Sequence, residues 1–422
     1  MAEQMKNSRL LTIFLIVFVD LLGFSLILPL LPYYAEEYGA TPAIIGMLVA
    51  SYAAAQFIGA PLLGRLSDRL GRRPVLLLSV AGTGIGFLLL GFAEPIGNLI
   101  AGWINPQAAD VFVLGVLFAS RILDGLTGGN ITVAQAYITD VTDEQNRARG
   151  LGIIGAAFGL GFIIGPAVGG ALSNWGYSLP AFVAAAVSLV NLFLIFFLLP
   201  ESLTLEQRKD AQQNRRPPFT FSALMQAIKR PRVGPLLQVR FFFALAFATF
   251  QTIFALFAQS IGLSSQTTGY VLAYVGLLSV ITQGGLIGPL TRRFKENTLM
   301  ITGLWVMTGA LFAWSFTHNL WQVLLLILPL AVSGGVLNTV IQSTITKAVT
   351  HQEVGGILGI SGSLESITRI IAPLAGGYLL QNLGLWAPGI FSAILMGIAI
   401  LLAYWRIILP GRRESVSVEV QG

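Results

Sequence analysis

The chain has no cysteine, only two histidines in 422 residues, and only 10% charged residues. Without thiols, a disulfide framework and cysteine-ligated zinc or iron–sulfur sites are excluded. The low charge excludes an ordinary soluble enzyme, in which roughly a quarter of the residues are charged. The chain is instead 55% hydrophobic with a mean hydropathy of +0.77, which predicts that it folds within a lipid bilayer.

Apolar runs of about 20 residues, long enough to cross the hydrocarbon as a helix, recur along the whole sequence. They are apolar all round and do not alternate, which argues against a transmembrane β-barrel. We therefore predict an all-α polytopic membrane protein with twelve transmembrane helices, near residues 10–32, 43–64, 74–93, 111–139, 148–173, 178–199, 233–260, 267–290, 298–317, 320–346, 354–381 and 385–409.

One long polar interruption divides the predicted spans six plus six, and the two halves resemble each other. Pro166 in the fifth span matches Pro373 in the eleventh, and pairs of glycines follow both prolines at the same distance. Parallel repeats of this kind imply a pseudo-two-fold axis along the membrane normal and a central site between the halves. We predict a six-helix bundle over 1–200, a central cytoplasmic loop over 201–232, and a second, pseudo-symmetric six-helix bundle with a short tail over 233–422.

The positions of the basic residues indicate on which side of the membrane each connection lies. All but three of the 25 Lys and Arg residues lie at the termini or in alternate connections, and the opposite connections contain only acidic charges. By the positive-inside rule, we expect both termini in the cytoplasm and the protein in the plasma (inner) membrane. The net charge of +6 is then a consequence of topology, and nucleic-acid binding is not expected. The three exceptions, Arg121, Arg240 and Arg369, lie inside predicted spans.

Two motifs indicate a protein that changes conformation. Residues 64–73 read G-R-L-S-D-R-L-G-R-R, in which glycines allow a tight turn and an acid among basic groups can hold a gate through ion pairs. The fifth span has glycines four apart around a proline, which allows close helix approach and a kink. A solvated basic loop and generic small-residue packing are the alternatives. The motif residues are Gly64, Asp68, Arg69, Gly71, Arg72 and Arg73 in the gate loop, and Gly161, Gly165, Pro166, Gly169 and Gly170 in the fifth span.

The corresponding loop of the second half, over 288–295, keeps a glycine and the basic residues. It has Arg292 where the first half has Asp68, so the acid of the motif is absent from the second copy.

Together these residues resemble the major facilitator superfamily, and within it the twelve-span drug:H⁺ antiporters. The loop at 64–73 is similar to the superfamily's first signature, and 161–170 to its antiporter signature. R-I-L-D-G at 121–125 resembles the R-x-x-Q-G signature with an acid at the glutamine position, and the first span resembles that of the tetracycline-efflux branch. The resemblance implies that spans 1, 4, 7 and 10 line a cavity and that a proton gradient, with no cofactor, drives transport.

Ionisable groups inside spans cost about 2.5–3.5 kcal/mol on insertion scales, so each is a functional candidate. Asp20 has no basic neighbour on its own helix and is our first candidate for the proton carrier, with a packing acid as the alternative. Arg121 and Asp124 are spaced to form an ion pair, either functional or structural, and for Glu365 and Arg369 a brace between helices is favoured. The remaining candidates for proton coupling or the cavity are Asn130, Gln251, Asn338 and Gln342, each of which can equally serve as a polar contact between helices.

We therefore expect a monomeric secondary transporter that exports amphipathic small molecules, such as tetracycline-like drugs, in exchange for H⁺ by alternating access. A uniporter or H⁺ symporter of a nutrient such as a sugar is the alternative, and a non-transporting membrane sensor is a more remote one. An enzyme is not expected, because no nucleophile–base set or metal-ligand spacing is visible. The substrate, the proton stoichiometry and the acid that carries the proton are open, as is the role of the long loop at 94–110.

Overall fold

The computed structural model describes residues 2–204, 206–208, 221–350 and 353–409. Over these ranges the regular structure is entirely helical, and twelve helical segments are long and apolar enough to cross a membrane. The predicted all-α, twelve-span class is thereby confirmed. The chain forms two compact units, one comprising Met1–Arg216 and Ala258–Gly276, the other Pro217–Phe257 and Leu277–Gly422.

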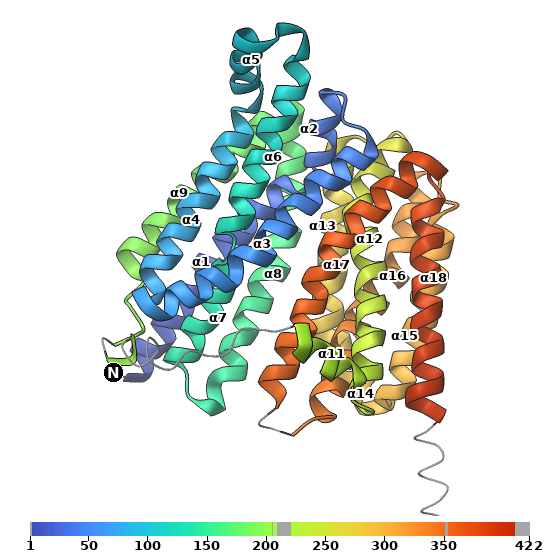
Figure 1. Ribbon diagram of the computed structural model, residues 1–422. Helices are drawn as coiled ribbons and strands as arrows, with labels where there is room; N and C mark the ends of the chain where they lie inside the picture. Colours follow the sequence, from blue (N-terminus) through green and yellow to red (C-terminus); the bar gives the residue numbers. More distant parts are fainter. Residues whose placement is uncertain (1, 205, 209–220, 351–352, 410–422) are drawn as a thin grey trace, which may run out of the picture. The chain divides into compact units, whose positions relative to one another are not determined.

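Unit 1 contains the helices drawn in blue to green in Figure 1. They are α1 (Ala2–Ile27), α2 (Leu31–Glu37), α3 (Pro42–Leu70), α4 (Arg72–Gly91), α5 (Ala93–Ile104), α6 (Ala109–Thr127), α7 (Asn130–Val141), α8 (Glu144–Leu172) and α9 (Ser178–Leu198), with short 3₁₀ turns at Pro106–Ala108 and Ser173–Trp175. Apolar side chains from α1, α4, α7, α8 and α9 meet in one core, which includes Ile13, Val80, Tyr137, Ala157 and Ile195.

Two segments of unit 1 differ from the sequence-based boundaries. The predicted fourth span is broken at Gly128 and Gly129 into α6 and α7, because two successive glycines are poor helix formers. The second span continues as helix to Leu70, so most of the 64–73 motif is helical and Gly71 alone forms the turn into α4. Gly71 has a φ of +110°, which a side chain would strain.

The long connection at 94–110 also has an ordered structure. It is helix α5 followed by a 3₁₀ turn, and α5 packs against the beginning of α6, as Figure 1 shows. Gly97 makes this approach possible, because a Cβ at this position would overlap the backbone of Val113. The segment is therefore a helical extension of the third and fourth spans.

Unit 2 has the second set of spans. They are formed by α12 (Gly234–Ser260), α13 (Ser265–Ile281), a π-helical turn (Thr282–Leu286), α14 (Ile287–Arg293), α15 (Glu296–Trp314), α16 (Leu320–Lys347), α17 (Val354–Leu383), α18 (Ala387–Ala403) and a final π-helical turn (Tyr404–Ile408), preceded by the short α11 (Phe221–Lys229). Residues 258–276, from the end of α12 through most of α13, belong to unit 1.

Three aromatic rings pack together inside unit 2. Phe250 and Phe257 of α12 contact Trp314 of α15 edge-on, with ring centroids 5.0 and 5.2 Å apart. All three side chains are buried. These phenylalanines of the seventh span are therefore packing residues of the unit.

Candidate functional site

The first charged cluster lies inside unit 1, where α1, α6 and α7 bring together four of the predicted site residues. Arg121 Nη1 lies 3.2 Å from Asp124 Oδ2, and these side chains are only 4% and 3% exposed. Asp20 of α1 lies close to Asp124 and to Asn130 of α7. The predicted ion pair between Arg121 and Asp124 is thus confirmed, and Asp20 is the second carboxylate beside it.

The surroundings of this cluster are apolar on one side and closely packed on another. The guanidinium of Arg121 lies 5.5 Å from the ring centroid of Phe87, in a cation–π contact. Gly86 of α4 faces Asp124, where a Cβ would come within 3.1 Å of the aspartate Cβ. Arg121 and Asp124 are therefore paired away from water, and Asp20 lies beside Asp124.

A second charged cluster lies inside unit 2, on α12, α16 and α17. Arg240 donates hydrogen bonds to Asn338 Oδ1 at 2.6 Å and to Glu365 Oε2 at 2.9 Å. The other oxygen of Glu365 accepts a bond from Arg369 at 3.0 Å. The predicted pair of Glu365 and Arg369 is confirmed, and together with Arg240 it does join helices.

Sequence reasoning identified Arg240 only as a basic residue within a span, and it missed this role. Its partners lie 98 and 125 residues away, and no local spacing reports them. The one available signal was the high cost of a guanidinium in a bilayer, which requires a partner somewhere. Of the other predicted cavity residues, Gln251 is exposed on α12 and Gln342 is partly buried on α16, and neither belongs to the two clusters.

The gate-loop motif forms an ion-pair network inside unit 1. Arg72 lies at the start of α4, with Nη1 2.7 Å from Asp68 Oδ1 and Nε 3.0 Å from Asp140 Oδ2. The Glu201 carboxylate accepts the backbone N–H groups of Arg72 and Arg73 at 2.9 and 3.2 Å. Asp140 and Glu201 were not predicted, since they follow Arg72 by 68 and 129 residues.

The remaining two motif residues have smaller structural roles. Arg69 is exposed and has no ion pair in the part of the chain that the structure describes. A Cβ at Gly64 would make only an ordinary contact with Thr132, at 3.8 Å.

The glycines of the fifth span pack α8 against its neighbours in unit 1. A Cβ at Gly165 or Gly169 would overlap Ser25 or the backbone of Leu26 on α1. Ser25 Oγ donates to the backbone oxygen of Gly161 at 2.8 Å, which only such a close approach allows. A Cβ at Gly170 would instead come within 3.1 Å of backbone atoms of α13, and Pro166 lies within α8.

Comparison with known proteins identifies the family of the chain. The family model described as the Major Facilitator Superfamily matches residues 13–304 and 241–422. The class C tetracycline resistance protein of Escherichia coli is 32% identical over 373 residues, 87% of this chain and 89% of that protein. Solute carrier family 22 member 18 of Rattus norvegicus is 29% identical over 89% of this chain and 88% of its own length.

Solved structures agree in fold. The human organic anion transporter MFSD10 (TETRAN) has a TM-score of 0.66 at 22% identity, covering 94% of this chain and 99% of that one. A D-xylose-proton symporter has a TM-score of 0.73 at 15% identity, covering 94% and 97%.

Proposed function

The chain belongs to the major facilitator superfamily, and from this premise we propose that it exports amphipathic small molecules, such as tetracycline-like drugs, in exchange for protons. That it is an integral multi-pass membrane transporter follows from its twelve apolar helices and its family. The tetracycline resistance proteins among its relatives support the substrate class. The distribution of basic residues supports cytoplasmic termini. We further propose that the protein lies in the inner membrane and acts as a monomer without a cofactor.

The observation that carries the proposal is the pair of carboxylates beside a single guanidinium in unit 1. With all three groups ionised, Arg121 balances Asp124, and Asp20 beside Asp124 leaves one negative charge unbalanced among the spans. Two like charges at close range in a medium of low dielectric repel strongly, and binding one proton removes that repulsion. Asp124 is held by Arg121, so Asp20 is the group that we assign to bind and release the proton.

Protonation can then be coupled to movement. The bound proton keeps Asp20 neutral during one half of the transport cycle. In the other half the proton has been released, and the charged carboxylate must be stabilised by the substrate or by water. The Arg72 network supports this scheme, since it joins the end of α3, the start of α4, α7 and Glu201. Such bracing suits a unit that moves as one rigid body during alternating access.

The test is the collapse of a preset pH gradient in inside-out vesicles when tetracyclines and a panel of amphipathic drugs are added. We expect one compound class to collapse the gradient, and Asp20→Asn to abolish the effect while the protein remains folded. Asp110→Asn is the matched control, because Asp110 is an exposed acid in the first turn of the helix that carries Asp124. Import driven by an inward proton gradient, or transport indifferent to the gradient, would overturn the proposal.

A further inference from the structure

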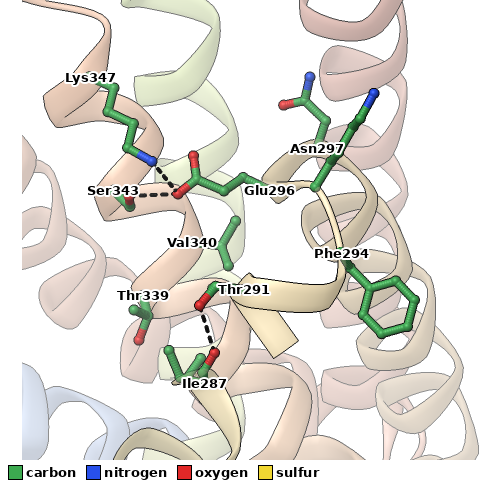
Figure 2. A pocket seen from close by; sticks show the side chains of 10 residues that line it. Ile287, Thr291, Phe294, Glu296, Asn297, Thr339, Val340, Ser343 and Lys347 are labelled. Atoms are coloured by element: carbon green, nitrogen blue, oxygen red, sulfur yellow. Dashed lines mark hydrogen bonds and ion pairs between the residues drawn. The ribbon is translucent and has the colours of Figure 1, made fainter. Parts of the chain in front are cut away.

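Unit 2 contains a cavity of about 670 Å³ beside the short connection between α14 and α15. Figure 2 shows it between this connection and the final turns of α16. Phe294 and Val340 form part of its apolar wall. Its polar lining includes Thr291, Lys295, Glu296, Asn297, Ser343 and Lys347.

The cavity lies where three membrane spans end. One candidate span ends at Arg293, the next begins at Glu296, and a third ends at Lys347. Its polar residues therefore lie at the level of the membrane surface, where lipid headgroups and soluble ions both have access.

Positive charge at the cavity exceeds what the chain itself neutralises. Lys347 Nζ donates to Glu296 Oε1 at 2.8 Å and Ser343 Oγ donates to the same oxygen at 2.7 Å, as the dashed lines in Figure 2 show. An ammonium group has three donors, so Lys347 keeps two after this bond. Within the described ranges, no acid pairs with Lys295 or with the adjacent Arg292 and Arg293.

The first copy of the motif, in unit 1, has an acid that the second copy lacks. There, Arg72 of the 64–73 motif is neutralised by Asp68 and Asp140, which belong to the same chain. In the second copy of the motif, Arg292 stands where Asp68 stands in the first. The second copy thus keeps its cations and loses an acid, and a cavity lies beside it.

The hydroxyl groups add selectivity. Thr291 donates its proton to the backbone oxygen of Ile287 at 2.9 Å, and Thr339 donates to that of Gly335 at 3.1 Å. Their oxygen atoms are then left with acceptor capacity only, which matches a ligand that has hydroxyl donors. Lys295 and the amide of Asn297 supply donors for an anionic group.

We propose that this cavity binds a phosphate group linked to a polyol, as in the headgroup of phosphatidylglycerol. The phosphate lies against Lys295 and Lys347, and the polyol hydroxyls donate to Thr291 and Thr339. A basic pocket between helices at the membrane surface is a known setting for anionic lipid headgroups. A soluble polyol phosphate has the same chemistry, so the experiment separates the two sources.

The experiment uses the purified full-length protein and native mass spectrometry. Phosphatidylglycerol and phosphatidylcholine with identical acyl chains are supplied together, and the retained lipids are counted. We expect preferential retention of phosphatidylglycerol, with the preference reduced about fivefold in Lys295→Gln, as one basic residue at a membrane surface predicts. Lys295→Arg should keep it. Lys229→Gln is the matched control, since Lys229 is an exposed lysine of the same unit outside the cavity.

Glycerol 3-phosphate is then added as a soluble competitor. Retention that it does not reduce supports the lipid as the ligand, and displacement of the lipid at millimolar competitor supports the same site with a soluble polyol phosphate. Equal retention of the two lipids, or an equal loss of preference in Lys295→Gln and Lys229→Gln, would overturn the proposal. Both variants replace exposed side chains, and an unchanged thermal midpoint shows that they are folded.

Discussion

Removal of the Glu365 carboxylate tests the charged cluster of unit 2 most directly. Glu365→Gln keeps a hydrogen-bond acceptor but removes the negative charge between Arg240 and Arg369. The Arg240 side chain is only 6% exposed, so after the substitution it keeps only neutral partners, Asn338 and the new amide, and has no counter-charge. Arg369 is 54% exposed, and solvent replaces its lost partner at little cost.

The magnitude follows from this asymmetry. Breaking a buried ion pair by removing one partner costs about 3–5 kcal/mol, and the partial exposure of Glu365 places the expected loss near the lower end, about 3 kcal/mol. The double variant Arg240→Gln/Glu365→Gln no longer has a buried unpaired charge. It should therefore be more stable than the sum of the single losses predicts, by about 2 kcal/mol of coupling.

The assay is reversible unfolding in mixed micelles of a mild detergent and dodecyl sulfate, followed by helical circular dichroism. Arg230→Gln, Glu353→Gln and their double variant form the control cycle, because this ion pair has the same chemistry but is exposed. The control cycle should show a coupling clearly smaller than that of the Arg240 cycle. If Glu365→Gln is as mild as Glu353→Gln, or if the Arg240 cycle is additive, the reasoning from burial is refuted.

Two further perturbations test helix packing and pH dependence. Gly165→Leu should destabilise the protein by about 2 kcal/mol and abolish transport, because the leucine side chain would overlap Ser25 on α1. The control is Gly155→Leu on the same helix, which should leave thermal unfolding nearly unchanged because position 155 faces open space. Hydrogen bonding from Arg230 lowers the pKa of Glu353. The pair therefore stabilises the fold at pH values above the usual pKa of glutamate, and this stabilisation is lost as the pH falls through the lowered pKa of Glu353. Hydrogen exchange of α11 should therefore rise in Arg230→Gln at neutral pH but not at acidic pH, and an equal rise at both would contradict the pairing.

The apolar runs and the short-range residue spacings of the sequence were sufficient to predict the fold class, the spans and part of the candidate site. A bilayer requires long apolar helices, so composition and run length predict twelve of them, and the described part of the chain contains twelve. Short spacings predict contacts on one helix, so the pairs Arg121–Asp124 and Glu365–Arg369 were readable. Glycines in the fifth span likewise indicated close packing before the partner helix was known.

Tertiary structure alone decided which distant groups meet. Arg240 finds Asn338 and Glu365, and Arg72 finds Asp140, only because helix packing brings positions 68 to 125 residues apart into contact. Helical periodicity repeats every few residues and carries no information on such partners. Sequence by itself thus determined that costly charges exist within the spans and must be compensated. The packing of the helices determined which side chain compensates each one, since the direction of every side chain depends on how its helix is turned toward its neighbours.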